Sequence, residues 1–243
     1  MAPIRKGDGT PLEIPGVSEV RSGDGRVFFD AIPDSGMFQD PIYQWWGAAG
    51  VDNTDWTDQL AEITASAVGS PNNQEIDGFE AWDYDGVDDA HNWSSDSQFP
   101  TGGEDVSVAA LVQLKDASDR HTITWWGDDN NHERIQFRFD DANVEAAIRG
   151  EPFASGSTTV STNEYVTVGF SLSNDPDLRV YLNGSEDASA TDGDVNVQDT
   201  NHAIGYDRAN SSDFGEINVA EVIVSSAQET EQAFSDYHND RLG

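Results

Sequence analysis

Short runs of β-forming residues recur along most of this chain, and they constrain its fold more than any other feature. In Arg134–Asp140, for example, Ile135, Phe137 and Phe139 alternate with polar residues, the period of two typical of a half-buried strand. Loops rich in Asp, Asn, Ser and Gly separate the runs. Many short strands with almost no helix predict an all-β, two-sheet antiparallel sandwich. The predicted strands are Ile42–Trp46, Phe79–Tyr84, Val106–Leu114, Thr122–Trp126, Ile135–Asp140, Val144–Ile148, Tyr165–Leu172, Leu178–Leu182, Ala203–Tyr206 and Ile217–Val224.

Local signals also predict one helix and one tight turn. Residues 227–241 carry apolar side chains at helical spacing, with Ser226 as a candidate N-cap and Glu229 three residues on as its capping-box partner. Asn183 and Gly184 are residue types that tolerate positive φ, as a type I′ hairpin turn requires. We therefore expect a short C-terminal helix and a hairpin at 183–184.

The charge of the chain sets the conditions in which it folds. Forty-six acidic residues face twelve basic ones, a formal net charge of -34 on 243 residues. Such a domain repels itself in ordinary buffer, but at 1 M salt the Debye length is only about 3 Å. The alternative of intrinsic disorder is opposed by seven Trp, eleven Phe and six Tyr. The composition thus indicates a folded protein that works in brine, from a halophile or from something that infects one.

Composition also excludes several classes of function. The chain has no cysteine, so it has neither disulfides nor a thiolate site. No apolar run approaches the roughly 20 residues that a membrane span needs. The opening MAPIRKG has no apolar stretch behind its basic pair, so we expect no secretory signal peptide. The negative field disfavours nucleic acid and anionic lipid, and we expect neither partner.

The charge is unevenly distributed, which suggests two parts. The first 26 residues have no net charge, so the other 217 carry all of the -34. We predict an attachment or oligomerisation segment over residues 1–35 and a sandwich domain over residues 36–243; a flexible tail is the alternative for the first part. The predicted apolar anchors of this segment are Ile4, Leu12, Phe28 and Phe29.

Five segments in chain order carry a more specific pattern: Trp56–Pro71, Trp82–Asp89, Val106–Leu114, Val168–Gly184 and Ile204–Val222. The second reads WDYDGVDD and resembles an "FDGVDDY" strand and turn, and the fourth ends in RVYLNG, similar to a "Y-V-N-G" hairpin. Together they resemble the concanavalin A-like, laminin G-like jelly-roll family over roughly residues 40–243. The resemblance implies a jelly-roll sandwich.

A possible catalytic motif reads EIDGFE over Glu75–Glu80. It is similar to the "E-I-D-x-x-E" strand of laminarinase-type glycoside hydrolases, in which two glutamates act as nucleophile and general acid. Gly78 interrupts the strand pattern, and the motif precedes most of the strands. The same residues also fit a non-catalytic lead-in with Asp77-Gly78 as a turn. We favour this second interpretation and predict that the protein is not an enzyme.

Calcium is the only cofactor that the sequence suggests, and only through the family. The resemblance implies a calcium ion at the rim of the sandwich, held by oxygen ligands. Asp85, Asp88 and Asp89 are the candidate ligands, with Asp128 and Asp129 as further possibilities. The alternative is that these are solvated carboxylates of a halophilic surface.

A carbohydrate-binding face is the third candidate site. Trp125-Trp126 adjoins a polar loop, and alternation along the strand sends one ring inward and the other outward. The inward ring belongs to the core, and the outward ring is either a stacking platform for a sugar or a cover for the sheet. A similar loop follows Tyr206. Sugars stack on aromatic rings, and Asp, Asn and His hydrogen-bond their hydroxyl groups. The candidate residues are Trp125, Trp126, Asp128, Asn130, His132, Asp207 and Arg208.

These features favour a non-catalytic surface protein of a halophilic virus, such as a capsid decoration, turret, spike or fibre subunit. We expect it to be made in the host cytoplasm without a signal peptide and to reach the virion surface. It would form homo-oligomers, contact other virion proteins through residues 1–35 and bind host-surface glycan. The alternative is a secreted or cell-surface lectin or laminarinase-like glycoside hydrolase of a halophilic archaeon.

Overall fold

The structure is a computed structural model that forms two compact units, Met1–Gly36 and Met37–Gly243. In the first unit it describes only the backbone of β1 (Glu19–Arg21) and β2 (Val27–Phe29), which pair antiparallel. The side chains of the predicted anchors Ile4, Leu12, Phe28 and Phe29 lie outside the described residues. In the second unit the described residues are 38–46, 55–61, 63–95, 97–149, 153–175, 177–191, 194–208 and 213–243.

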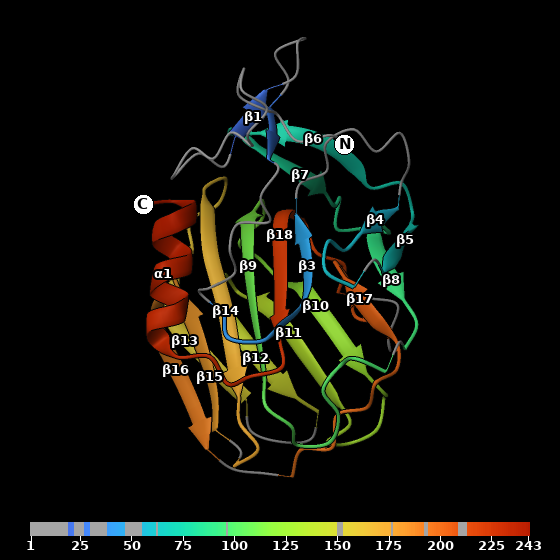
Figure 1. The fold of residues 1–243 in the computed structure, drawn as a ribbon, viewed down its shortest axis with the longest axis vertical. Coiled ribbons are helices and arrows are strands. Elements are labelled where there is room, and N and C mark those ends of the chain that lie inside the picture. Colours follow the sequence, from blue (N-terminus) through green and yellow to red (C-terminus); the bar gives the residue numbers. More distant parts are fainter. Residues whose placement is uncertain are drawn as a thin grey trace, which may run out of the picture. The chain divides into compact units, whose positions relative to one another are not determined.

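The second unit is a sandwich of two antiparallel sheets, which confirms the predicted all-β jelly-roll architecture (Figure 1). One sheet, called here the β10 sheet, has the strand order β13-β12-β11-β10-β17-β8-β5-β4. The other, the β9 sheet, has the order β16-β15-β14-β9-β18-β7-β6, and β3 also pairs with β18.

The strands of the β10 sheet are β4 (Trp56–Thr57), β5 (Thr64–Val68), β8 (Ala90–Trp93), β10 (Arg120–Gly127), β11 (Arg134–Asp140), β12 (Asn143–Ile148), β13 (Phe153–Thr159) and β17 (His202–Ile204). Those of the β9 sheet are β3 (Pro41–Trp46), β6 (Asn72–Ile76), β7 (Phe79–Asp83), β9 (Val106–Leu114), β14 (Tyr165–Leu172), β15 (Asp177–Leu182), β16 (Ser185–Thr191) and β18 (Ile217–Ser225).

The hydrophobic core lies between the two sheets and is rich in aromatic side chains. Ile135, Phe137 and Phe139 of β11 all point into it, as their alternation predicts. Trp126 of β10 lies 5.8 Å from Phe170 of the facing sheet, ring centre to ring centre. Each large apolar side chain buried in this way contributes roughly 1.5–3 kcal/mol to folding.

The only helix in the described part of the chain is α1 (Glu231–Arg241), which is far too short and polar to cross a membrane. It begins later than predicted, because its N-cap is Thr230, whose Oγ1 accepts a hydrogen bond from the backbone N–H of Ala233 at 3.3 Å. The prediction of Ser226 as the cap is therefore wrong. Glu229, its predicted partner, is instead buried before the helix begins.

Helix α1 covers the outer face of the β9 sheet (Figure 1). The ring of Phe234 stacks on that of Tyr181 with centroids 3.9 Å apart. Gly169 of β14 allows this close approach, because a Cβ at that position would lie 2.3 Å from the Cε1 of Phe234. The helix therefore closes this face of the sandwich where it packs.

A buried charge network fixes the C-terminal turn of α1 to the sheet. Glu221 of β18 is 0% exposed and accepts two hydrogen bonds from Arg241, Nε to Oε2 at 2.7 Å and Nη2 to Oε1 at 3.0 Å. The hydroxyl of Tyr237 and the amide of Gln44 also donate to its carboxylate. The guanidinium of Arg241 lies 4.6 Å above the ring of Trp46. The four hydrogen bonds to Glu221 compensate a buried carboxylate that would be costly if left unpaired.

The Asn183-Gly184 prediction is confirmed. The two residues have φ values of 49° and 80°, and they join β15 to β16. This left-handed pair matches the right-handed twist of the flanking strands.

Candidate functional site

The outer face of the β10 sheet, the face turned away from the core, presents a continuous row of side chains. The strand register pairs Phe153 with Ala147, Ala147 with Gln136, and Gln136 with Trp125, across β13, β12, β11 and β10. The neighbours of these residues along each strand, such as Phe137, point into the core. Because side chains alternate along a strand, the row lies on the opposite face.

The two tryptophans split as predicted, but neither offers a ring to a ligand. Trp126 lies in the core and Trp125 on the outer face, yet both are only 1% exposed. Trp125 belongs to a buried cluster with Tyr206 of the loop after β17, and Phe214 stacks on Tyr206 with centroids 5.1 Å apart. Of the two interpretations of the outward ring, stacking platform or sheet cover, the burial of Trp125 fits sheet cover.

The loop after β10 joins a charge-balanced group, called here the Asp129 cluster: Asp129, Arg134, Arg149 and Asp207. Arg134 donates from Nη1 to Oδ1 of Asp129 at 2.8 Å, and Arg149 forms an ion pair with the same carboxylate. The buried Asp207 lies 3.8 Å from the Nη1 of Arg134. The structure thus brings Asp207, a predicted site residue, to the loop that holds Asp128, Asn130 and His132.

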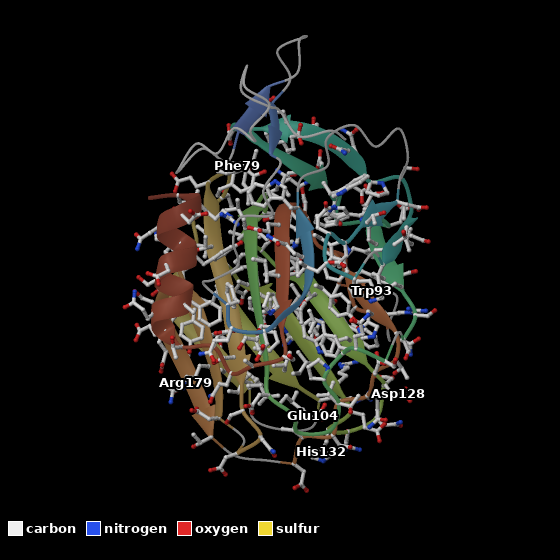
Figure 2. All side chains as sticks on the ribbon, in the orientation of Figure 1. Phe79, Trp93, Glu104, Asp128, His132 and Arg179 are labelled. Atoms are coloured by element: carbon white, nitrogen blue, oxygen red, sulfur yellow. The ribbon has the colours of Figure 1, made fainter. Side chains whose placement is uncertain are left out.

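The other predicted loop residues are held by short contacts. The Nδ2 of Asn130 donates to Glu133 at 2.8 Å, and Nδ1 of His132 lies 2.8 Å from the carbonyl oxygen of Asp194. Figure 2 shows Asp128 and His132 at the same end of the sandwich. Arg208 extends elsewhere, since its Nη1 donates to the carbonyl oxygen of Trp93 at the end of β8. Arg208 therefore contacts a different part of the sheet.

Phe153 is a surface feature that the sequence analysis missed. Its side chain is 53% exposed, and it is the only aromatic residue in the described ranges that is classed as exposed. Its cross-strand partner is Ala147, and Arg149 follows in the turn just after β12 ends at Ile148. The alternation of Phe153, Ser155 and Ser157 with smaller inward residues would have placed it on the outer face had β13 been predicted.

The three predicted calcium ligands do come together. One carboxylate oxygen from each of Asp85, Asp88 and Asp89 lies within 4.8 Å of the others, whereas Asp128 and Asp129 join no such group in the described ranges. Three carboxylates at this spacing fit the oxygen ligands that Ca²⁺ prefers. Calcium binding at this loop stays a prediction.

The pKa values of two carboxyl groups in this loop shift in opposite directions. Burial raises the pKa of Asp85, but the backbone N–H groups of Val87 and Asp88, which donate to its Oδ1, outweigh that effect and hold the pKa below its usual value. Burial raises the pKa of Asp89 above its usual value, and the nearby charges of Asp85 and Asp88 act in the same direction, despite the hydrogen bond from the backbone N–H of Ser70.

A cavity of about 620 Å³ opens at the other end of the β10–β11 pair. Its wall includes Arg120, paired with Asp140 at 3.2 Å, and the ring of Phe214. An acidic wall is the expected surface of a chain with 46 acidic residues, and by itself it indicates no ligand. The six carboxylates of the cavity belong to Asp116, Asp119, Asp140, Asp141, Asp213 and Glu216.

The Glu75–Glu80 motif forms a hairpin and not a single strand. Asp77 and Gly78, with φ values of 51° and 88°, make the turn between β6 and β7. Glu75 and Glu80 pair across the two strands, and both are exposed. The interpretation of Asp77-Gly78 as a turn is confirmed, so the motif does not form the strand that the laminarinase-type pattern requires.

No protein-family model matches this sequence, and no curated protein matches it. Solved structures do match the fold. Domain 4 of AbnA, an extracellular GH43 arabinanase from Geobacillus stearothermophilus in complex with arabinotriose, is 17% identical with a TM-score of 0.65. The match covers 82% of this chain and 98% of that domain.

Receptor-binding domains of botulinum neurotoxins match as well. That of the C/D mosaic serotype is 12% identical with a TM-score of 0.66, over 83% of this chain and 51% of the toxin domain. The serotype D ligand-binding domain in complex with N-acetylneuraminic acid is 13% identical with a TM-score of 0.65, over 83% and 51%. This chain thus spans about half the length of those domains. At these identities the likeness shows the β-sandwich fold.

Proposed function

We propose that this domain binds carbohydrate, without catalysis, on the outer face of the β10 sheet beside the Asp129 cluster. The observation that carries the proposal is the cluster itself, in which two guanidinium groups and two carboxylates meet next to the polar loop of Asn130 and His132. Guanidinium forks donate and carboxylates accept, which suits the paired hydroxyls of a sugar. The arabinotriose complex of the arabinanase domain, which shares the fold, supports the proposal.

Glycan binding is tested on an array of immobilised glycans in about 3 M KCl, where surface charges are screened. The intact protein should retain at least one glycan, and Asn130→Ala combined with His132→Ala should weaken that binding about tenfold, a change of about 1.4 kcal/mol. The matched controls are Glu75→Gln and Glu80→Gln, two exposed carboxylates of the β6–β7 hairpin, which should bind normally. If the unchanged protein hydrolysed a bound glycan and Glu75→Gln or Glu80→Gln abolished that hydrolysis, the non-catalytic assignment would be contradicted.

We further propose that the protein is displayed on the surface of a halophilic virus as a decoration, turret, spike or fibre subunit and binds host-surface glycan. Two features support this role: the net charge of -34, which suits brine, and the change from an uncharged first 26 residues to an acidic body. Residues 1–35 would attach the subunit to its own copies or to other virion proteins. Apolar anchors suit such contacts, since ion pairs count for little in molar salt.

Deleting residues 2–35 tests the attachment segment. The shortened protein should stay folded, with unchanged circular dichroism, because Met37–Gly243 is a compact unit by itself. Light scattering in about 3 M KCl should show an oligomer for the full chain and a monomer for the deletion. Monomers in both cases, together with no binding to virus particles that lack this subunit, would rule out an anchoring role.

A further inference from the structure

We infer that Phe153 is the ring on which the bound sugar stacks, and that this sugar is uncharged. The inference rests on the proposed function and names the platform and the ligand class of the same site. It replaces Trp125, which lies in the same cross-strand row but is buried in a cluster with Tyr206.

Phe153 is more than half exposed, and its described neighbours are small. On the same face, the paired residue Ala147 is small, and Ser155, two residues along β13, is small and exposed. A single exposed apolar side chain is ordinary on a protein surface. Phe153 differs because its partner in the row, Ala147, is small and because Arg149 of the Asp129 cluster follows two residues after Ala147, so an aromatic face and hydrogen-bonding groups come to one end of the sheet.

The distances set by the sheet allow one ligand to reach both features. Diagonal neighbours across an antiparallel pair lie about 7–8 Å apart, within reach of aromatic and long side chains. Arg149 lies in the turn after β12, two residues beyond the Ala147 that pairs with Phe153, and its backbone N–H still donates to the carbonyl oxygen of Arg134 on β11 at 3.3 Å. This placement puts Arg149 at the same end of the sheet as Phe153. A sugar ring stacked on Phe153 would therefore place its hydroxyl groups beside Arg149 and the carboxylate of Asp129.

The charge balance of the cluster selects an uncharged ligand. Arg134 and Arg149 both contact Asp129, and Asp207 lies near Arg134, so both guanidinium groups are already compensated, and Asp128 and Glu133 of the same loop add negative charge that disfavours an acidic sugar. An acidic sugar would have to displace Asp129 from its guanidinium partners, and a basic sugar would have to displace Arg149. Hydroxyl groups both donate and accept hydrogen bonds, so they add to the pairs without breaking them.

The same surface is too small and too polar for a protein partner. A stable protein interface buries more than about 1,000 Å² and centres on packed apolar anchors. Here one aromatic side chain lies among alanine, serine and charged residues. The face of a single sugar unit matches an area of this size and mixture.

The test is isothermal titration of the full-length protein with neutral and acidic probes in about 3 M KCl. The neutral probes are arabinotriose, cellotriose and mannotriose, and the acidic probe is sialyllactose. We expect a neutral probe to bind, Phe153→Ala to weaken it at least tenfold, and Phe153→Trp to retain it within threefold. Val87→Ala, at another exposed apolar residue outside the site, is the matched control and should bind as the unchanged protein does. Circular dichroism checks that each variant is folded.

Varying the salt concentration and the charge of the probe shows which part of the inference fails: the Phe153 platform, the uncharged ligand class or glycan binding itself. The dissociation constant of the neutral probe should stay constant between about 1 and 4 M KCl, because no charge is transferred on binding. Normal binding by Phe153→Ala, while the Asn130→Ala, His132→Ala variant loses it, would overturn the platform and leave the proposed function standing. Tighter binding of sialyllactose would overturn the uncharged class. Absence of any glycan binding by the unchanged protein would overturn the proposed function and this inference with it.

Discussion

Lowering KCl from about 3 M to 0.1 M is expected to unfold this domain cooperatively, with loss of its β-sheet circular dichroism, as the Debye length grows from under about 3 Å to about 10 Å. The net charge of -34 then repels itself across the whole surface. The melting temperature should fall by more than about 20 °C, since each kcal/mol lost from the free energy of unfolding lowers it by roughly 2–4 °C in a domain of this size. A melting temperature that does not change over this range would contradict the electrostatic explanation.

Acidification at low salt provides an independent arm of this experiment. Burial raises the pKa of Asp89 and of Glu229 above their usual values. A carboxyl group whose pKa is raised by folding binds its proton more tightly in the folded state, so stability increases as pH falls through the raised pKa. We therefore expect partial recovery of the folded signal at 0.1 M KCl as the pH is lowered from neutral through the raised pKa values of these two groups. Sucrose is the control for the salt effect. Added at 0.1 M KCl to the water activity of the high-salt sample, it should restore less of the folded signal than KCl does, because sucrose screens no charge.

Arg241→Ala is expected to produce the largest loss of stability of any single substitution proposed for this protein, about 3–5 kcal/mol. The substitution leaves Glu221 buried without the guanidinium that donates to both of its oxygens. It also removes the stacking of Arg241 on Trp46. Guanidinium chloride unfolding measures the change, and the matched control is Arg179→Ala. Arg179 is exposed and paired with Asp177 and Glu186, so its loss should cost less than about 1 kcal/mol.

A second substitution shows whether the buried charge is the cause. Glu221→Gln in the Arg241→Ala background replaces the unpaired carboxylate by an uncharged amide of similar shape. We expect the double variant to be more stable than Arg241→Ala alone, because the cost lies in the uncompensated charge. Equal losses for Arg241→Ala and Arg179→Ala, or no recovery in the double variant, would show that the network contributes little.

The strands that the sequence predicts are those with an apolar face toward the core. All ten predicted runs overlap strands of the sandwich, and Val106–Leu114 and Tyr165–Leu172 match β9 and β14 residue for residue. The strands missed are short or polar. β6 reads NNQEI and β16 reads SEDASAT, and both lie at the edge of the β9 sheet with few buried side chains. An edge strand is held by backbone hydrogen bonds, which leave no apolar period in the sequence.

The candidate site was less predictable because its features depend on distant contacts. The alternation of Trp125 and Trp126 is visible in the sequence, but the burial of Trp125 in a cluster with Tyr206 is not. The link from Asp207 to Arg134 joins residues on separate loops. Phe153 belongs to an unpredicted strand, and nothing in its own neighbourhood reveals that its ring is open to solvent.

The burial of the tryptophans has a spectroscopic consequence. Six of the seven are buried, and the seventh, Trp46, is half-buried beneath the guanidinium of Arg241. Native emission should be blue-shifted, so a red shift would report opening of the sandwich itself. A sugar stacked on Phe153 would leave that emission nearly unchanged. One fluorescence trace can thus follow unfolding during a glycan titration without interference from the ligand.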